Sequence, residues 1–231
     1  MTRRMDVALS FAGETLRPLP CGALYWPARH TLFVADLHFE KASAFARRGW
    51  LLPPHDSAET LRLLIDAIEA TGARRIVCLG DSFHDRGGPD RLLPGPRAAL
   101  RTLTASLDWL WITGNHDDSA GASLGGRVMP EARIGALTLR HEADANDAAP
   151  ELSGHYHPKV AVHMRGRRIV RRAFAVSASK IILPAYGAFT GGLDIGDPAI
   201  TGVMRGAVTA VVAEGARLLR FPVAGVKITS A

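Results

Sequence analysis

The sequence contains few cysteines and no long apolar run. Two cysteines, Cys21 and Cys78, are too few for a disulfide framework, so we expect both to be reduced and inert. Apolar stretches such as 32–35 and 181–183 are far shorter than the roughly 20 residues that cross a bilayer. Segment 1–6 is not followed by the apolar core of a secretory leader. These absences predict a cytoplasmic protein that does not span a membrane.

Lysine is also scarce, because only four of the 28 basic residues are lysine. The formal net charge is nevertheless +6 and the sequence pI is near 9.9. Such a charge suits a polyanionic ligand, since cationic surfaces concentrate molecules that carry phosphate. An arginine-rich and alanine-rich composition can also reflect nucleotide bias in a genome. The charge therefore allows a nucleic-acid partner without identifying one.

The chain has enough apolar residues for a large core: 47% of its 231 residues are hydrophobic. A single domain over 1–231 is the simplest expectation. Residues 7–35 alternate short apolar runs with turn residues, which predicts a strand meander. A helix then follows from an N-cap at Asp56 or Ser57 to Thr71, because apolar residues recur there at helical spacing.

The two halves of the chain differ in pattern. In the first half strands alternate with helices, which favours crossover units and parallel pairing. In the second half short β-rich segments are separated by Gly, Pro or Asp, without a long helical period. The remaining predicted elements are strands at 75–79, 109–113, 136–140, 160–164, 168–176 and 208–212, and a helix near 97–105.

Polar residues follow the predicted strands where each one ends. Asp36 and His38 follow the run 32–35, and a spacing of two on an extended segment points both side chains to one side. Asp81 follows a strand that stops at Gly80, and its carboxylate has two oxygens that can bridge two cations. Each pattern alone is weak, since a strand-ending Asp, a surface His and a Gly-Asp turn are all common.

Three more polar groups come later in the chain. Gly114-Asn115-His116-Asp117 follows a third strand, and it offers a neutral amide oxygen and an imidazole that titrates near neutrality. His141 follows the segment 136–140. Gly154-His155-Tyr156-His157 supplies two further imidazoles on one side of an extended segment, and imidazole is the commonest metal ligand. A lone histidine is usually packed or on the surface, and this interpretation is given to His30, His55 and His163.

Taken in order, Asp-x-His, Gly-Asp, Gly-Asn-His-Asp, a lone His and Gly-His-x-His resemble the signature of the calcineurin-like metallophosphoesterases, over Asp36 to His157. The resemblance implies an α/β fold with two packed mixed β-sheets, flanked by helices, and a metal site at strand ends. It implies two divalent metal ions, with Asp81 as the bridge. One ion would be held by Asp36, His38, Asp81 and His157, and the other by Asp81, Asn115, His141 and His155.

The same resemblance implies that His116 is a catalytic side chain and that Asn115 and His116 contact the phosphate. Two ions roughly 3.5 to 4 Å apart can share a water, lower its pKa and hold the phosphate for in-line attack by hydroxide. His116 could stabilise charge or protonate the leaving oxygen. Mixed oxygen and imidazole ligands are compatible with Mn, Fe or Zn, and the resemblance described below favours Mn.

One position departs from the family pattern. An Asp usually stands three residues after the bridging Asp and orients the catalytic His, but this chain has His84 there, in Asp81-Ser82-Phe83-His84-Asp85. Either Asp85 takes over the orienting role from a shifted loop, or His84 projects into the site and contacts the phosphate as a catalytic residue. A loop histidine without a role is the third alternative.

The Asp-Ser-Phe-His-Asp form of the motif resembles the bacterial ligase-associated DNA damage response endonucleases, the PdeM group. This implies an Mn-dependent phosphodiesterase and DNA endonuclease in DNA repair, with a repair ligase or helicase as possible partner. Two alternatives stay open: a phosphomonoesterase or small-nucleotide phosphodiesterase with the same metals, and, disfavoured by the full ligand set, a non-catalytic scaffold. A basic run could track DNA or form the solvated face of a hairpin: Arg165, Arg167, Arg168, Arg171 and Arg172.

Overall fold

The computed structural model describes residues 7–116, 120–164 and 167–223. Its first sheet has the strand order β1-β2-β3-β4-β5-β6-β7. The pairs from β1 to β4 are antiparallel, and those from β4 to β7 are parallel, as the sequence predicts for this half. The strands are β1 (Leu9–Phe11), β2 (Glu14–Pro18), β3 (Leu24–Trp26), β4 (Thr31–Val34), β5 (Arg75–Leu79), β6 (Asp108–Ile112) and β7 (Arg127–Met129).

The second sheet has the order β16-β15-β13-β14-β10-β9-β8. Strands β9, β10 and β14 run parallel, and the other pairs are antiparallel, so this sheet is mixed like the first. Its strands are β8 (Ala132–Ile134), β9 (Leu137–Leu139), β10 (Glu151–Ser153), β13 (Phe174–Val176), β14 (Lys180–Ile182), β15 (Val208–Glu214) and β16 (Arg217–Val223).

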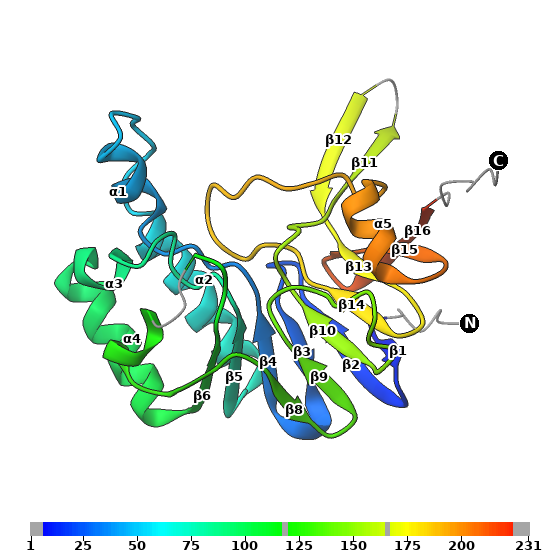
Figure 1. Cartoon of the computed structure of the whole chain (residues 1–231), viewed down its shortest axis with the longest axis horizontal. Coiled ribbons are helices and arrows are strands. Elements are labelled where there is room, and N and C mark those ends of the chain that lie inside the picture. Colours follow the sequence, from blue (N-terminus) through cyan, green and yellow to red (C-terminus); the bar gives the residue numbers. More distant parts are fainter. Residues whose placement is uncertain (1–6, 117–119, 165–166, 224–231) are drawn as a thin grey trace.

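The two sheets pack face to face over one apolar cluster. Trp26 and Phe33 from the first sheet meet Leu152, Phe174 and Ile181 from the second, all nearly fully buried. Because side chains alternate between the faces of a strand, the opposite face of the first sheet needs a second cover. Helices provide it, and the expected class of two mixed sheets flanked by helices is confirmed (Figure 1).

Helices α2 to α4 lie on the side of the outer face of the first sheet, α1 packs against α2 and α3 at the end of the sheets, and α5 lies against the second sheet (Figure 1). No helix in the described part of the chain combines the length and apolarity that a bilayer span requires. The helices are α1 (Lys41–Ala46), α2 (Asp56–Thr71), α3 (Gly88–Arg91), α4 (Pro94–Ser106) and α5 (Pro198–Met204), with short 3₁₀ turns at Pro27–Arg29 and Ala120–Leu124.

Two sequence-based details need correction. The predicted N-cap role of Asp56 and Ser57 is wrong: both are helical, and their side chains accept hydrogen bonds from the amides of Ala42 and Glu40. The carboxylate that could have capped α2 therefore fixes the start of α1 instead. The predicted strand 168–176 is two strands, because Ala173 turns away to donate to the carbonyl of Pro158. Its first part, β12 (Arg167–Arg172), forms a separate hairpin with β11 (Lys159–Met164).

Candidate metal centre

The parallel pairing of β4 and β5 continues past the ends of both strands. The amide of Asp36 donates to the carbonyl of Gly80 at 3.2 Å, and the amide of His38 donates to the carbonyl of Asp81 at 2.9 Å. This extension places the two carboxylate-bearing residues side by side at the carboxyl edge of the sheet. Such edges are where α/β folds usually assemble their sites.

The second sheet brings its histidines to the same edge. The amide of Gly154 donates to the carbonyl of His141 at 2.8 Å, which joins the loops after β9 and β10. The amide of His155 then donates to both oxygens of Asp36, at 3.2 and 3.0 Å. The loops from the two sheets are therefore bonded directly to each other at the site.

Backbone conformation at this edge is unusual. Asp36, His38, Asp81, His155 and His157 all have positive φ, between 45° and 73°. A non-glycine residue in this region costs on the order of 1–3 kcal/mol, and such residues concentrate at functional sites. The assumption that Asp36 and His38, or His155 and His157, lie on extended segments is thus wrong. Left-handed turns, and not strand alternation, aim these side chains.

Two glycines make the close approach possible. A Cβ atom on Gly154 would lie 2.7 Å from Oδ2 of Asp36, and one on Gly80 would overlap the ring of His141. Gly80 also has φ of +79°, a conformation open to glycine. The glycines of the Gly-Asp and Gly-His-x-His motifs are therefore needed for the two sheets to meet here.

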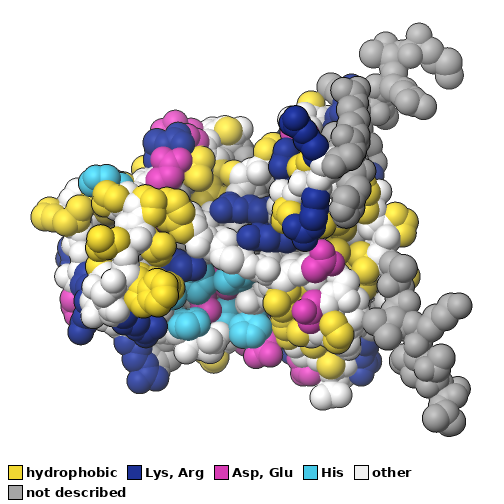
Figure 2. Space-filling model, turned by 90° about the horizontal axis from the view of Figure 1, so that it is seen from above, with side chains coloured by type: hydrophobic (Ala, Val, Ile, Leu, Met, Phe, Trp, Pro, Cys, Tyr) yellow, Lys and Arg dark blue, Asp and Glu magenta, His cyan; other side chains and the backbone are white. Residues whose placement is uncertain are grey.

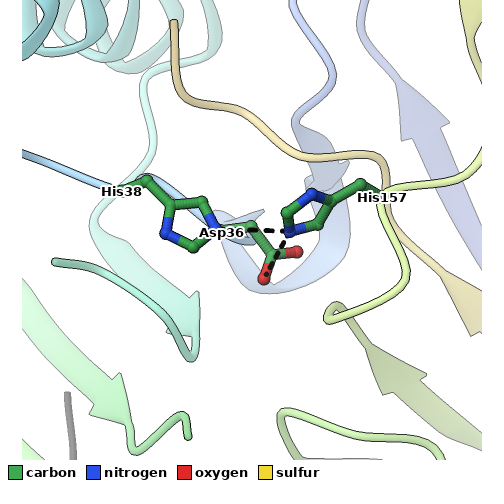
Figure 3. Close-up of side chains that lie close together, drawn as sticks. All are labelled: Asp36, His38 and His157. Atoms are coloured by element: carbon green, nitrogen blue, oxygen red, sulfur yellow. Dashed lines mark hydrogen bonds and ion pairs between the residues drawn. The ribbon is translucent and has the colours of Figure 1, made fainter. Parts of the chain in front are cut away.

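The first candidate ligand group consists of Asp36, His38 and His157, which point toward one another in Figure 3. Nε2 of His157 lies 3.3 Å from Nε2 of His38 and 3.4 Å from Oδ1 of Asp36. Asp36 is completely buried, and His38 is 5% exposed. One ligand atom from each of the three lies within 4.8 Å of the others, a spacing that one cation can bridge.

The second candidate group consists of Asp36, Asp81 and His141. Nε2 of His141 lies 3.5 Å from Oδ2 of Asp81 and 2.8 Å from Oδ1 of Asn115. Nδ1 of His155 lies 3.1 Å from the same amide oxygen. Asp36 is common to both groups and Asp81 belongs to one, so the bridging role of Asp81 stays a prediction.

The three residues predicted to be catalytic, His84, Asp85 and His116, belong to loops at the exposed rim of the cluster. His116, whose side chain is 45% exposed, donates its backbone amide to Oδ1 of Asp81 at 3.0 Å. The ring of His84 stacks on that of His116, with centroids 5.7 Å apart. Asp85 turns the other way and forms an ion pair with Arg91 at 2.9 Å. Of the two alternatives for the departing motif, the geometry favours His84 in the site over Asp85 orienting His116.

Burial and charge set the protonation states of the cluster. Burial, and after it the charge of His157, lower the pKa of His38 to about 2, and burial also lowers the pKa of His155. Burial raises the pKa of Asp81, but the hydrogen bond and charge of His141, the amide of His116 and the charge of His38 together outweigh burial and lower this pKa to about 2. The neutral rings of His38 and His155 and the ionised carboxylate of Asp81 are the states that cation ligands require. His141 differs: burial lowers its pKa, but a hydrogen bond to Asp81 and the charges of Asp36 and Asp81 together raise it to about 9, so this ring would release a proton when a cation binds.

A second observation also indicates that these residues are suited to bind cations. Nε2 of His38 and Nε2 of His157 face each other at 3.3 Å, and two neutral rings can share at most one proton at that contact. The carboxylate of Asp36 lies 3.4 Å from the same nitrogen of His157. A cation held between these three side chains would accept lone pairs that the bare contact leaves facing one another.

Sequence reasoning missed one residue of the cluster, Glu142. Its Oε1 accepts from the Tyr156 hydroxyl at 3.3 Å and lies 3.9 Å from Nε2 of His155. The carbonyl of Leu79 likewise lies 3.0 Å from Nδ1 of His141. Such partners fix the ring orientation and tautomer of a metal-binding histidine. The position of Glu142 directly after His141 was the available signal.

The remaining predicted residues lie elsewhere. His30 and His55 are exposed, in agreement with a surface interpretation, and the side chain of His163 is not described. The basic run forms β12 of the hairpin, where Arg172 is half-buried and donates to the carbonyls of Tyr186 and Gly187. Asp117 and Arg165 lie outside the described residues.

Ligand groups of carboxylates and imidazoles at the strand ends of a two-sheet α/β fold define the class of the protein, a metal-dependent hydrolase. The sequence model of the calcineurin-like phosphoesterase family matches residues 29–165. This is more than half of the chain, and the chain belongs to that family. Family members use divalent metal ions for phosphoester hydrolysis, the chemistry that the two ligand groups suit.

Similar solved structures extend the likeness over almost the whole chain. The Pseudomonas putida nuclease MPE is 29% identical, with a TM-score of 0.72, and the match covers 93% of this chain and 98% of that one. The phosphoesterase YfcE of E. coli is 15% identical, with a TM-score of 0.42, and the match covers 84% of this chain and 99% of that one. No curated protein is similar enough to count as a match.

Proposed function

We propose that the protein is a two-metal phosphodiesterase that cleaves nucleic acid, acting as a DNA endonuclease. The observation that carries this proposal is that the seven predicted ligands lie together at one edge of the two sheets, where Asp36, His38, Asp81 and His141 are buried. The likeness to a nuclease over 93% of the chain supports a diester as substrate. The ligands are Asp36, His38, Asp81, Asn115, His141, His155 and His157.

Asp36, His38, Asp81 and His157 would hold one divalent ion, and Asp81, Asn115, His141 and His155 the other, with Mn²⁺ as the preferred metal. The ions would supply an activated water and positive charge for the phosphate oxygens. Only two of the seven ligands carry negative charge, against the four positive charges of two divalent ions, so the site would keep a net positive charge toward the phosphate. His141 is held by the Leu79 carbonyl and keeps its other nitrogen toward the site.

His116 is the protein group best placed to act on the leaving oxygen. Its ring is exposed, and Nε2 lies 3.9 Å from Oδ2 of Asp81 at the edge of the metal-ligand cluster. An imidazole there can donate a proton to the departing oxygen or a hydrogen bond to the transferring phosphate. His84 stacks on it and would limit its motion, as well as offering a second contact to the phosphate.

The test begins with metal-stripped protein, to which Mn²⁺ is added. Turnover is compared on a chromogenic diester, the corresponding monoester and supercoiled plasmid. Hydrolysis of the diester together with plasmid nicking is expected. Preference for the monoester would contradict the proposal, and a wild type that binds no metal and turns over no substrate would favour a scaffold. Further proposals are a single domain over 1–231 and a cytoplasmic location, both expected from the length and pattern of the sequence, and a repair ligase or helicase partner, implied by the family resemblance.

A further inference from the structure

A groove of about 740 Å³ opens at the rim of the metal-ligand cluster, beside His84 and His116. Its opposite wall is formed by the end of α1 and the turn that follows, which include Phe45, Arg47 and Arg48. None of these three residues belongs to the candidate metal groups. The groove therefore extends the site away from the candidate ligand groups, on the side where His116 is exposed.

The groove is positively charged. Arg47 and Arg48 are exposed, and neither forms an ion pair with another described residue. Asp85 is the acidic residue of the lining, but both of its oxygens contact Arg91, at 2.9 and 3.0 Å. Its charge is thus compensated by Arg91, which lies outside the lining. The three arginines of the lining, Arg47, Arg48 and Arg86, are exposed and give the groove its net positive charge. Arginine keeps its charge at any relevant pH and matches phosphate oxygens with paired N–H donors.

Aromatic rings line the path from the groove to the cluster. The ring of Phe45 lies 5.3 Å from that of His84, which in turn stacks on His116 at an interplanar angle of 15°. Grooves that combine positive charge with aromatic faces bind nucleic-acid strands, because bases stack on the rings while the cations follow the backbone. Figure 2 shows a central group of histidines on one face of the molecule, with another histidine apart from it and with Lys and Arg side chains on more than one side of the group.

We propose that this groove binds the part of a polyphosphodiester strand next to the scissile phosphate, with Arg47 and Arg48 contacting neighbouring phosphates and Phe45 contacting a base. The proposal rests on the proposed function, since it assigns the substrate of that same site. It follows that the protein distinguishes a strand from a small diester with one phosphate. DNA and RNA share this chemistry, so both belong in the test.

Binding is measured first, on the metal-free full-length chain with labelled DNA and RNA strands of equal length. The double variant Arg47→Gln/Arg48→Gln should weaken binding about tenfold at low salt, because two phosphate contacts are lost. The slope of log K against log salt should fall by about one to two. The matched control is Arg74→Gln/Arg101→Gln, which removes the same charge from exposed positions before β5 and on α4. Equal weakening in both double variants would overturn the proposal.

Cleavage is measured next, with Mn²⁺ added. The ratio of kcat/KM on the strand to kcat/KM on the chromogenic diester should fall about tenfold in the groove variant and stay constant in the control. An unchanged ratio, or wild-type protein that does not bind strands, would overturn the groove assignment while leaving diester hydrolysis intact. Arginine-dependent strand binding without hydrolysis of any diester would instead support the groove and contradict the proposed function. The loss of kcat/KM in the groove variant is compared between DNA and RNA strands. The strand type with the larger loss identifies the sugar that the groove accepts.

Discussion

The floor and the rim of the site are built in different ways. The floor, formed by Asp36, His38, Asp81 and His141, is buried and sits on strand ends joined by backbone hydrogen bonds. The rim, formed by His84 and His116, is more exposed and sits on loops. The floor holds ligands in strained conformations that need a rigid frame, whereas the rim must remain open to substrate. Substitutions in the two regions should therefore differ in their effects: those in the floor should lower metal content, and those in the rim should lower turnover with metal retained.

The largest effect is expected from Asp36→Asn in the floor. Asp36 belongs to both candidate ligand groups, so loss of its charge weakens both cation sites. Loss of metal-based stabilisation is worth several kcal/mol, or roughly 1,000-fold in kcat/KM. Elemental analysis should show metal loss in parallel with the kinetics. Asp66→Asn, an exposed position on α2, is the matched control, and full metal content in Asp36→Asn would contradict the assignment.

His116→Ala in the rim should lower kcat about 100-fold, the usual contribution of a positioned proton donor. Metal content should be unchanged, because the ring lies outside both candidate ligand groups. This separation of activity from metal content is the sharpest contrast between rim and floor. His55→Ala removes an exposed histidine beside α2 and should change neither quantity. Metal loss in His116→Ala would place His116 in the floor.

Gly154→Ala tests the contact between the two sheets. A Cβ atom there would lie 2.7 Å from both the Ala35 Cβ and Oδ2 of Asp36, so the floor must shift. We expect a loss of about 1–3 kcal/mol in the free energy of unfolding and roughly tenfold weaker metal binding. Gly202→Ala on α5, where a Cβ meets nothing within 4 Å, should be neutral or stabilising. Thermal unfolding and metal titration measure both effects, and equal stability of the two variants would refute the contact.

The smallest effect is expected from His84→Ala. Its ring packs on His116 but lies outside the candidate ligand groups, so we expect kcat to fall about threefold to tenfold with metal content retained. Asp85→Asn should leave kcat nearly unchanged, because Asp85 is engaged by Arg91. Steady-state kinetics on the chromogenic diester decides between the two residues. A larger loss in Asp85→Asn would restore the orienting role of Asp85.

The floor was largely predictable from the sequence, and the rim was not. Apolar runs that stop at Gly80, Gly114 and Gly154 predicted where strands end and which side chains follow them. The predicted reason for the convergence of the side chains, alternation along extended segments, was wrong. Five of the residues have left-handed backbone conformations, which the spacing of the motifs does not reveal. The pattern of residues did not predict that the second sheet meets the first at the site, because β10 has only three residues. That expectation came from the family resemblance.

The rim depends on features that carry little signal in the sequence. Helix α1 has six residues, too few to show a helical period, and it places Phe45 opposite His84. The choice between His84 and Asp85 depends on Arg91, six residues after Asp85, which holds that carboxylate away from the site. Contacts of this kind arise from tertiary packing and are absent from the spacing of the motif.

Helix α1 and the β11–β12 hairpin stand at the same end of the two sheets (Figure 1). The guanidinium of Arg172, at the end of β12, donates to the carbonyls of Tyr186 and Gly187. The amides of these same two residues donate to the carbonyls of Ala35 and Asp36. Two successive hydrogen bonds, through residues 186–187, therefore anchor the base of the hairpin to the main chain of the buried Asp36.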